Sequence, residues 1–179
     1  MVVLITGASH TGKTRLAQMM MEKYHYPYLS EDHIKMGLIR SGYTDLTPED
    51  DAELTGYLWP VIREMIKTVI ENDQNLIVEG CYVPFDWQND FTAEYLNKIR
   101  FLCLCLSDRY IDAHFGDIKQ YASCIESRPE DDDSTADQIK RDNRFYLDGC
   151  RSHHLEVVLI ETDYTETTEK LLELPIMQQ

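Results

Sequence analysis

Gly7-Ala8-Ser9-His10-Thr11-Gly12-Lys13-Thr14 is the stretch that decides the fold of this chain. It follows an apolar run, Met1–Ile5, that predicts a buried strand, and it leads into Lys13–Tyr24, where apolar residues recur at helical spacing. Glycines let the backbone N–H groups of such a loop wrap an anion, and the following helix directs its positive end at it. The spacing is that of a phosphate-binding loop, and a plain glycine-rich turn is the alternative.

The loop residues have individual expected roles. Lys13 is expected to bridge the β- and γ-phosphates of a nucleoside triphosphate, and the hydroxyl of Thr14 is expected to bind Mg²⁺. The complete predicted nucleotide-binding segment is Gly7, Ala8, Ser9, His10, Thr11, Gly12, Lys13, Thr14 and Arg15.

Four more short apolar segments predict strands, and helical patterns separate them. The strands are expected at 27–29, 75–81, 99–106 and 155–160. The longest helical pattern is expected to start with Thr47 as the cap and Pro48 in the first turn, and Pro60 is expected to kink or split it. Strands that alternate with helices predict an α/β fold with a parallel sheet covered on both faces.

Composition narrows the classes of function. The chain has 179 residues, one domain's length, with 17 lysines and arginines against 32 acids and a net charge of −15. That charge disfavours duplex DNA and anionic membranes as partners. No apolar run approaches the roughly 20 residues of a membrane span, and no signal peptide is expected. Five cysteines without a CxxC pair indicate reduced thiols and a cytoplasmic location, with Cys103 and Cys105 on one face of a strand.

Several weaker features follow the phosphate loop, and their order along the chain resembles that of a known family. They are an acid after the second strand, Val78-Glu79-Gly80 after the third, an arginine-bearing stretch, and a terminal strand and helix. In this order the sequence resembles P-loop kinases, in particular the branch of adenylate kinase, gluconate kinase and chloramphenicol phosphotransferase. The resemblance implies one three-layer P-loop NTPase domain over residues 1–179, with strand order 2-3-1-4-5, a helical lid near 121–150, and ATP with Mg²⁺.

Two carboxylates are predicted at the reacting centre. The ends of parallel strands open at one edge of a sheet, so an acid after the second strand lies near the phosphate loop. The resemblance gives Asp32 the role of accepting the acceptor's proton; Glu31 is the alternative, and helix capping by both acids is a third interpretation. Glu79 is expected to hold the metal or its waters or, alternatively, to act as the base.

Cationic side chains are predicted both around the phosphates and around the acceptor. Arg128, Arg141 and Arg144 are expected to close over the phosphates, although Arg141 and Arg144 also have the spacing of surface pairs with Asp137 and Asp148. Arg40 and Arg63 are expected to bind the acceptor. Further candidates are Arg109 for the phosphates, and Tyr82, Phe85 and Trp87 for the acceptor pocket or, alternatively, the core.

These features predict an ATP-dependent kinase that phosphorylates a small-molecule acceptor, first of all a hydroxyl. Two alternatives stay open: a nucleoside monophosphate kinase, and a nucleotide-binding regulatory module with little turnover. The sequence does not indicate the oligomeric state.

Overall fold

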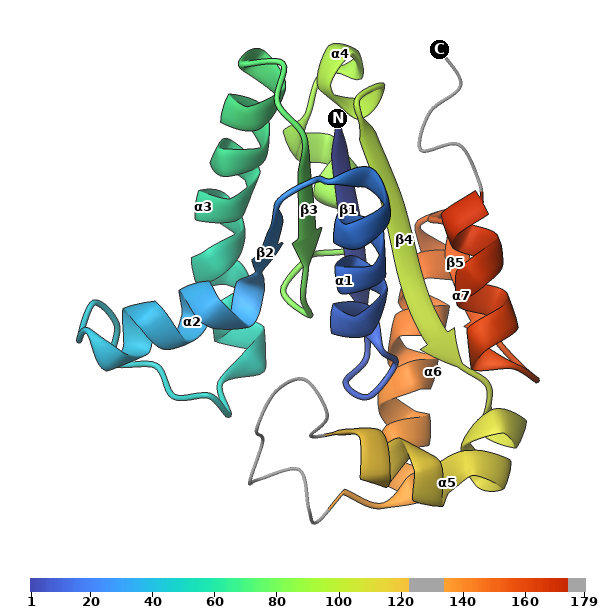
Figure 1. Ribbon diagram of the computed structural model, residues 1–179. Helices are drawn as coiled ribbons and strands as arrows, with labels where there is room; N and C mark the ends of the chain where they lie inside the picture. The colour runs from blue at the N-terminus through green and yellow to red at the C-terminus, as the bar shows by residue number, and fades with distance from the viewer. Residues whose placement is uncertain (123–133, 174–179) are drawn as a thin grey trace.

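A five-stranded parallel sheet forms the centre of the chain in the computed structural model, which describes residues 1–122 and 134–173 (Figure 1). The strand order is β2-β3-β1-β4-β5, so the α/β fold and the order predicted from the sequence are confirmed. The strands are β1 (Val2–Gly7), β2 (Tyr28–Ser30), β3 (Leu76–Glu79), β4 (Ile99–Leu106) and β5 (Val157–Ile160).

Helices cover both faces of this sheet and complete three layers (Figure 1). Side chains of β1 alternate between the faces: Val3 and Ile5 pack with Leu16 on one side, whereas Val2 and Leu4 join the core under α3 and α6. The helices are α1 (Lys13–Tyr24), α2 (Glu31–Arg40), α3 (Asp51–Glu71), α4 (Ala93–Leu96), α5 (Asp108–Ala122), α6 (Ala136–Ser152) and α7 (Tyr164–Glu173), with a 3₁₀ turn, η1 (Trp87–Asp90).

The long helix α3 differs from its prediction at two points. It begins at Asp51 rather than Pro48, because the carboxylate of Asp50 accepts hydrogen bonds from the backbone N–H and the hydroxyl of Thr47 and closes a separate turn. The helix continues through Pro60 without a split. Pro60 lies on the exposed side, where the carbonyl that it deprives of a partner can bind water.

The carboxyl ends of the strands meet at one edge, with the β1–α1 loop at the centre and α2 and α5 on either side (Figure 1). The register fixes this arrangement, since Glu79 pairs with both Ile5 of β1 and Ser30 of β2. The backbone N–H of Gly80 then donates to the carbonyl of Ile5 at 3.1 Å. Residues that follow β1, β2 and β3 are thereby brought together.

The two β4 cysteines lie on the same face, as the strand pattern predicts. Cys103 and Cys105 are fully buried in the core on the α3 and α6 side, with 3.9 Å between their sulfur atoms. Cys150 of α6 lies in the same core and is also a free thiol. Among the described residues, no helix combines the length and the apolar character needed to cross a bilayer.

Candidate functional site

The phosphate loop adopts a backbone that requires glycine at two positions. Gly7 has φ +136°, and a Cβ atom there would lie 2.1 Å from the carbonyl oxygen of Leu104. Gly12 has φ +80°, and its Cβ would lie 2.1 Å from the hydroxyl of Tyr164. His10 also has a positive φ, of 66°. The loop therefore turns sharply between β1 and α1 while it stays packed against β4 and α7.

Lys13 lies against this loop rather than in solvent. Its Nζ atom donates to the carbonyl of Ala8 at 2.8 Å, and the side chain is almost fully buried. The hydroxyl of Thr11 donates to the same carbonyl at 2.9 Å. Ser9 is half-buried, whereas Arg15 points from the first turn of α1 into solvent. The loop thus holds one buried ammonium group at the start of a helix, as an anion site requires.

Tyr164, the first residue of α7, is a loop contact that the sequence analysis did not identify. Its hydroxyl donates to the carbonyl of Gly12 at 3.0 Å. Burial raises the pKa of Tyr164 to about 12, so the hydroxyl remains a donor at neutral pH. The sequence carries no signal for this contact, because 152 residues separate the two partners.

Thr14 and Glu79 form the part of the site suited to a metal ion. The Thr14 hydroxyl donates to Oε2 of Glu79 at 3.3 Å, and Glu79 is 2% exposed. A hydroxyl and a carboxylate are oxygen ligands of the kind that Mg²⁺ takes alongside water and substrate phosphates. No cluster of three or more histidine, cysteine, aspartate or glutamate ligands occurs among the described residues. The hydroxyl and the carboxylate therefore fit a metal that also takes oxygen ligands from water and from a nucleotide.

Glu31 occupies the space between the ends of β2 and β3. It is fully buried, and its Oε2 accepts the backbone N–H of Tyr82 at 2.7 Å. Gly80 makes room for it, since a Cβ on Gly80 would lie 2.1 Å from the same oxygen. Burial raises the pKa of Glu31 to about 8; the Tyr82 N–H lowers it, while the charges of Glu79 and Asp32 raise it further. Glu31 consequently carries a proton in most molecules at neutral pH.

Asp32 and Lys35 form an ion pair one residue further along α2. Lys35 Nζ lies 2.7 Å from Oδ1 of Asp32, and the two side chains are 13% and 21% exposed respectively. Lys35 also donates to the Tyr82 hydroxyl at 2.9 Å, and that hydroxyl donates to Oδ1 of Asp51 at 3.1 Å. Tyr82 is thus a buried core residue whose hydroxyl joins this polar network. Phe85 packs on Tyr146 and Trp87 stacks on Phe101 in the core.

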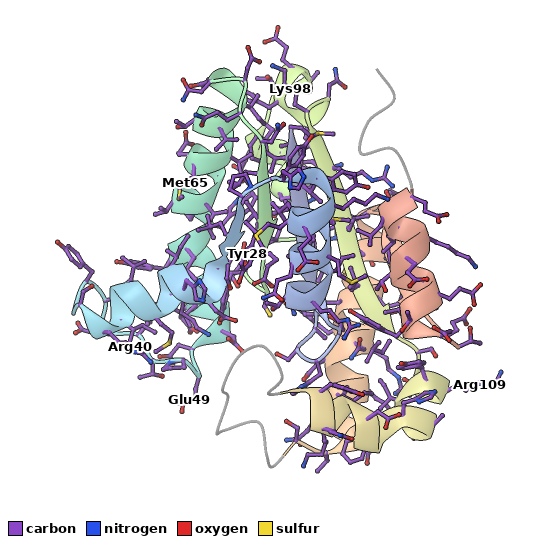
Figure 2. The ribbon with its side chains drawn as sticks, in the orientation of Figure 1. Tyr28, Arg40, Glu49, Met65, Lys98 and Arg109 are labelled. Atoms are coloured by element: carbon purple, nitrogen blue, oxygen red, sulfur yellow. The ribbon has the colours of Figure 1, made fainter. Side chains whose placement is uncertain are left out.

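The two arginines expected at the acceptor have other surroundings. Arg63 donates to Asp90 at 2.9 Å, and Trp59 Nε1 donates to the other oxygen of that carboxylate at 2.7 Å. This network ties α3 to η1. Arg40 ends α2 and is exposed; Figure 2 places it at the opposite side of the molecule from Arg109.

The predicted lid is described only in part. Arg128 lies outside the described residues, and so does the segment around it. On α6, Arg144 forms a bidentate ion pair with Asp108 at the start of α5, and Lys140 pairs with Asp112. Arg141 is exposed. The guanidinium of Arg144 therefore joins two helices in this state of the chain.

Asn143 holds α6 against the sheet and was not singled out by its sequence pattern. Its Oδ1 accepts the backbone N–H of Leu106 at 2.7 Å, and its Nδ2 donates to the carbonyl of Ile139 at 2.8 Å. Tyr146, one turn further along, donates to the carbonyl of Cys81 at 2.8 Å. These two bonds set the position of α6 relative to the ends of β3 and β4.

Solved structures of kinases share the fold of this chain. Deoxyadenosine kinase from M. mycoides superposes with a TM-score of 0.58 at 15% sequence identity, over 96% of this chain and 97% of that one. Shikimate kinase from Aquifex aeolicus gives 0.53 at 12% over 96% and 94%, and a gluconokinase from Sinorhizobium meliloti gives 0.51 at 12% over 96% and 89%. No protein-family model and no curated protein sequence matches the chain.

The fold class of the chain follows from the order of the strands, the phosphate loop and the similarity to these solved structures. The chain has the fold of the P-loop small-metabolite and nucleoside kinases, as the sequence predicts.

Proposed function

We propose that this chain is an ATP-dependent phosphotransferase that moves the γ-phosphoryl group of ATP, with Mg²⁺, to a hydroxyl of a small molecule. The observation that carries the proposal is the convergence of three groups at one sheet edge. They are the phosphate loop with Lys13, the Thr14–Glu79 pair, and the Asp32–Lys35 pair. A phosphoryl donor site, a metal ligand set and a proton acceptor are the parts that such a transfer requires.

In the proposed step, the acceptor oxygen forms a bond to the γ-phosphorus while the bond from that phosphorus to the bridging oxygen of ADP breaks. Lys13 and the loop N–H groups bind the phosphate oxygens and hold them for in-line attack. Thr14 and Glu79 would hold Mg²⁺, which would supply positive charge to the phosphates. The proton of the acceptor hydroxyl passes to the Asp32 carboxylate. Arg128, Arg141 and Arg144 stay predictions as ligands of the transferring group.

Asp32 suits the role of base better than Glu31. An acid whose pKa is near 8 already holds a proton at neutral pH, so Glu31 has little capacity to accept another. Asp32 is ion-paired with Lys35, and this contact fixes the direction of its carboxylate. Glu31 then serves as a buried support beneath Tyr82.

The test is ADP release from Mg·ATP, with and without pooled hydroxyl metabolites and nucleoside monophosphates. We expect release that depends on one acceptor, falls at least about a hundredfold in Lys13→Ala, and falls similarly in Asp32→Asn. Lys23→Ala, which removes an exposed lysine at the far end of α1, is the matched control.

Three results would contradict parts of this proposal. Full activity in Asp32→Asn would remove the assigned base and favour a monophosphate acceptor, which needs no strong base. ATP binding without any acceptor-dependent release would favour a regulatory module. ADP release that survives in Lys13→Ala would exclude the phosphate loop as the donor site.

A cytoplasmic location stays a prediction from the cysteines.

A further inference from the structure

Tyr82, three residues after the end of β3, binds α2 at two points. Its backbone N–H donates to Oε2 of Glu31 at 2.7 Å, and its hydroxyl accepts from Nζ of Lys35 at 2.9 Å. Asp32 lies between these two residues in the helix, with its Oδ1 2.7 Å from Nζ of Lys35. The helical residues on both sides of the proposed base are therefore bound to one tyrosine.

The hydroxyl of Tyr82 is itself fixed by α3. It donates to Oδ1 of Asp51, in the first turn of that helix, at 3.1 Å. Burial raises the pKa of Tyr82, and the charges of Asp51 and Asp32 raise it further, so the hydroxyl keeps the proton that it donates. Asp51, Tyr82, Lys35 and Asp32, here called the Tyr82 network, thus join α3, the loop after β3 and α2 through consecutive contacts.

Lys67 on α3 has the local surroundings of Lys35 without the hydroxyl. It pairs with Glu64, three residues before it, at 2.9 Å, and its Nζ lies 5.7 Å from the centre of the Phe91 ring. The corresponding distances at Lys35 are 2.7 Å to the carboxylate three residues before it and 5.2 Å to the tyrosine ring. A phenyl ring attracts an ammonium group but has no oxygen that can accept its N–H.

Burial also distinguishes the two ion pairs. The side chains of Lys67 and Glu64 are 23% and 57% exposed, whereas those of Lys35 and Asp32 are 13% and 21% exposed. An exposed pair separates easily and contributes little to stability. A pair that is shielded from water and bound to a third group keeps one geometry. A base that must meet a hydroxyl at hydrogen-bond distance requires such a fixed geometry.

We propose that Tyr82 and Lys35 are positioning residues of the site: the Tyr82 hydroxyl, anchored on Asp51, holds the Lys35 ammonium group, which holds the Asp32 carboxylate in the direction of the acceptor hydroxyl. The inference rests on the proposed function for the role of Asp32 as the base. The ordering of Lys35 by Tyr82 does not depend on that function, and the two parts are tested separately.

The ordering of Lys35 is measured first, without nucleotide or turnover. NMR relaxation of Cε, the last carbon of each lysine side chain, gives an order parameter for every lysine, and Lys67 is the reference in the same spectrum. Lys35→Arg and Lys67→Arg assign the two signals. We expect Lys35 to be more ordered than Lys67 in the wild-type chain and to fall to about the level of Lys67 in Tyr82→Phe. An order parameter of Lys35 that does not exceed that of Lys67, or that Tyr82→Phe leaves unchanged, would overturn the proposal.

Asp51→Asn is the second variant, because Asp51 is exposed and the change keeps the size of the side chain. An amide accepts the Tyr82 hydroxyl less strongly than a carboxylate does, so Lys35 should lose part of its order. In the Tyr82→Phe background, Asp51→Asn should have no further effect, since the hydroxyl that connects the two residues is gone. An equal loss in both backgrounds would overturn the part of the proposal that concerns Asp51.

Turnover shows whether this ordering serves the reaction. The maximal rate of ADP release from Mg·ATP with the pooled hydroxyl metabolites is expected to fall about tenfold in Tyr82→Phe, while the KM for ATP stays unchanged. Tyr95→Phe is the matched control with an unchanged rate, because Tyr95 also donates its hydroxyl to a carboxylate of α3, Glu71, at the other end of that helix. An unchanged maximal rate beside a raised KM for ATP, or equal losses in the two variants, would overturn the positioning role.

The proposed function and the positioning role fail in different ways. Lower order of Lys35 in Tyr82→Phe, together with no acceptor-dependent ADP release by the wild-type chain, would overturn the kinase and support the contact between Tyr82 and Lys35. ADP release by the wild-type chain, with the order of Lys35 and the maximal rate both unchanged in Tyr82→Phe, would support the kinase and overturn the positioning role.

Discussion

The hydroxyl of Thr14 donates to Oε2 of Glu79 across 3.3 Å, and this contact joins the first turn of α1 to the end of β3. It exists because β1 and β3 are parallel neighbours in which Ile5 pairs with Glu79. A helix that starts after β1 and a carboxylate that ends β3 must then meet at the same edge. A hydroxyl and a carboxylate that are 65 positions apart in the chain are thereby placed side by side.

Glu79→Gln is expected to weaken the binding of Mg²⁺ while the fold is kept. The amide oxygen can still accept from Thr14, but the charge that attracts the metal is lost. The Mg²⁺ concentration for half-maximal ATP turnover should rise about tenfold or more. Initial rates over a Mg²⁺ series measure it, and Glu22→Gln on the exposed face of α1 is the control. An unchanged Mg²⁺ requirement would remove Glu79 from the metal site.

Glu31 makes the stability of the chain depend on pH. Its pKa of about 8 in the folded state lies above the ordinary 4.5, so the folded chain keeps a proton that the unfolded chain has released. The stability that this proton contributes is complete below about pH 4.5 and is lost as the pH rises through about 8.

Glu31→Gln should remove this loss, because an amide does not titrate. Relative to the variant, the wild-type chain should lose about 2 kcal/mol of unfolding free energy between about pH 6 and about pH 8. Urea denaturation of both proteins at the two pH values, without Mg²⁺ or nucleotide, measures the difference. Parallel stability profiles would show that Glu31 is ionised in the folded chain throughout.

Tyr164→Phe removes the hydrogen bond to the carbonyl of Gly12 and keeps the ring that packs beside the loop. A lost hydrogen bond of this kind costs about 1 kcal/mol, which lowers Tm by about 2–4 °C in a chain of this size. The KM for ATP should rise several-fold because the strained turn at Gly12 is held less firmly. Thermal melts and ATP titrations check both effects against Tyr43→Phe, which alters an exposed ring. A normal KM beside a lowered Tm would give Tyr164 a purely structural role.

Asn143→Ala should destabilise the junction of α6 and β4. The buried N–H of Leu106 loses its acceptor, which costs about 1–3 kcal/mol of unfolding free energy. Urea unfolding compared with Asn89→Ala, an exposed asparagine, measures it. If both variants were equally stable, water would have to replace the amide at Leu106.

The fold was predictable because its signals are local. The glycine spacing of residues 7–14, the apolar strands and the helical patterns each act within a few residues, and alternation of strands with helices restricts the sheet to parallel pairing. The start of α3 was predicted wrongly because a local pattern does not show which partner a side chain bonds to. Thr47 and Asp50 have the composition of a helix cap, but their side chains bond to one another in a turn that precedes the helix.

The surroundings of the site residues were less accessible from the sequence. Position after a strand indicated Asp32 and Glu79, and the phosphate loop indicated Lys13. The sequence could not show that Arg63 is paired with Asp90 or that Tyr82 bonds to both Lys35 and Asp51. The residues of these pairs lie 27 to 47 positions apart in the chain. Nor could it distinguish the buried Glu31 from its more exposed neighbour, since the difference depends on the space above Gly80.

The edge of the sheet remote from the phosphate loop provides a point at which a label or a tether can be attached. The turn between α3 and β3, where Asp73 has φ 50° and all residues from Glu71 to Asn75 are exposed, lies at that edge beside Lys98. A surface tether attached at this turn would immobilise the chain with its phosphate loop facing the solution. A fluorophore attached there would label the chain away from the site. Single molecules could then be watched through repeated nucleotide binding without the label entering the site.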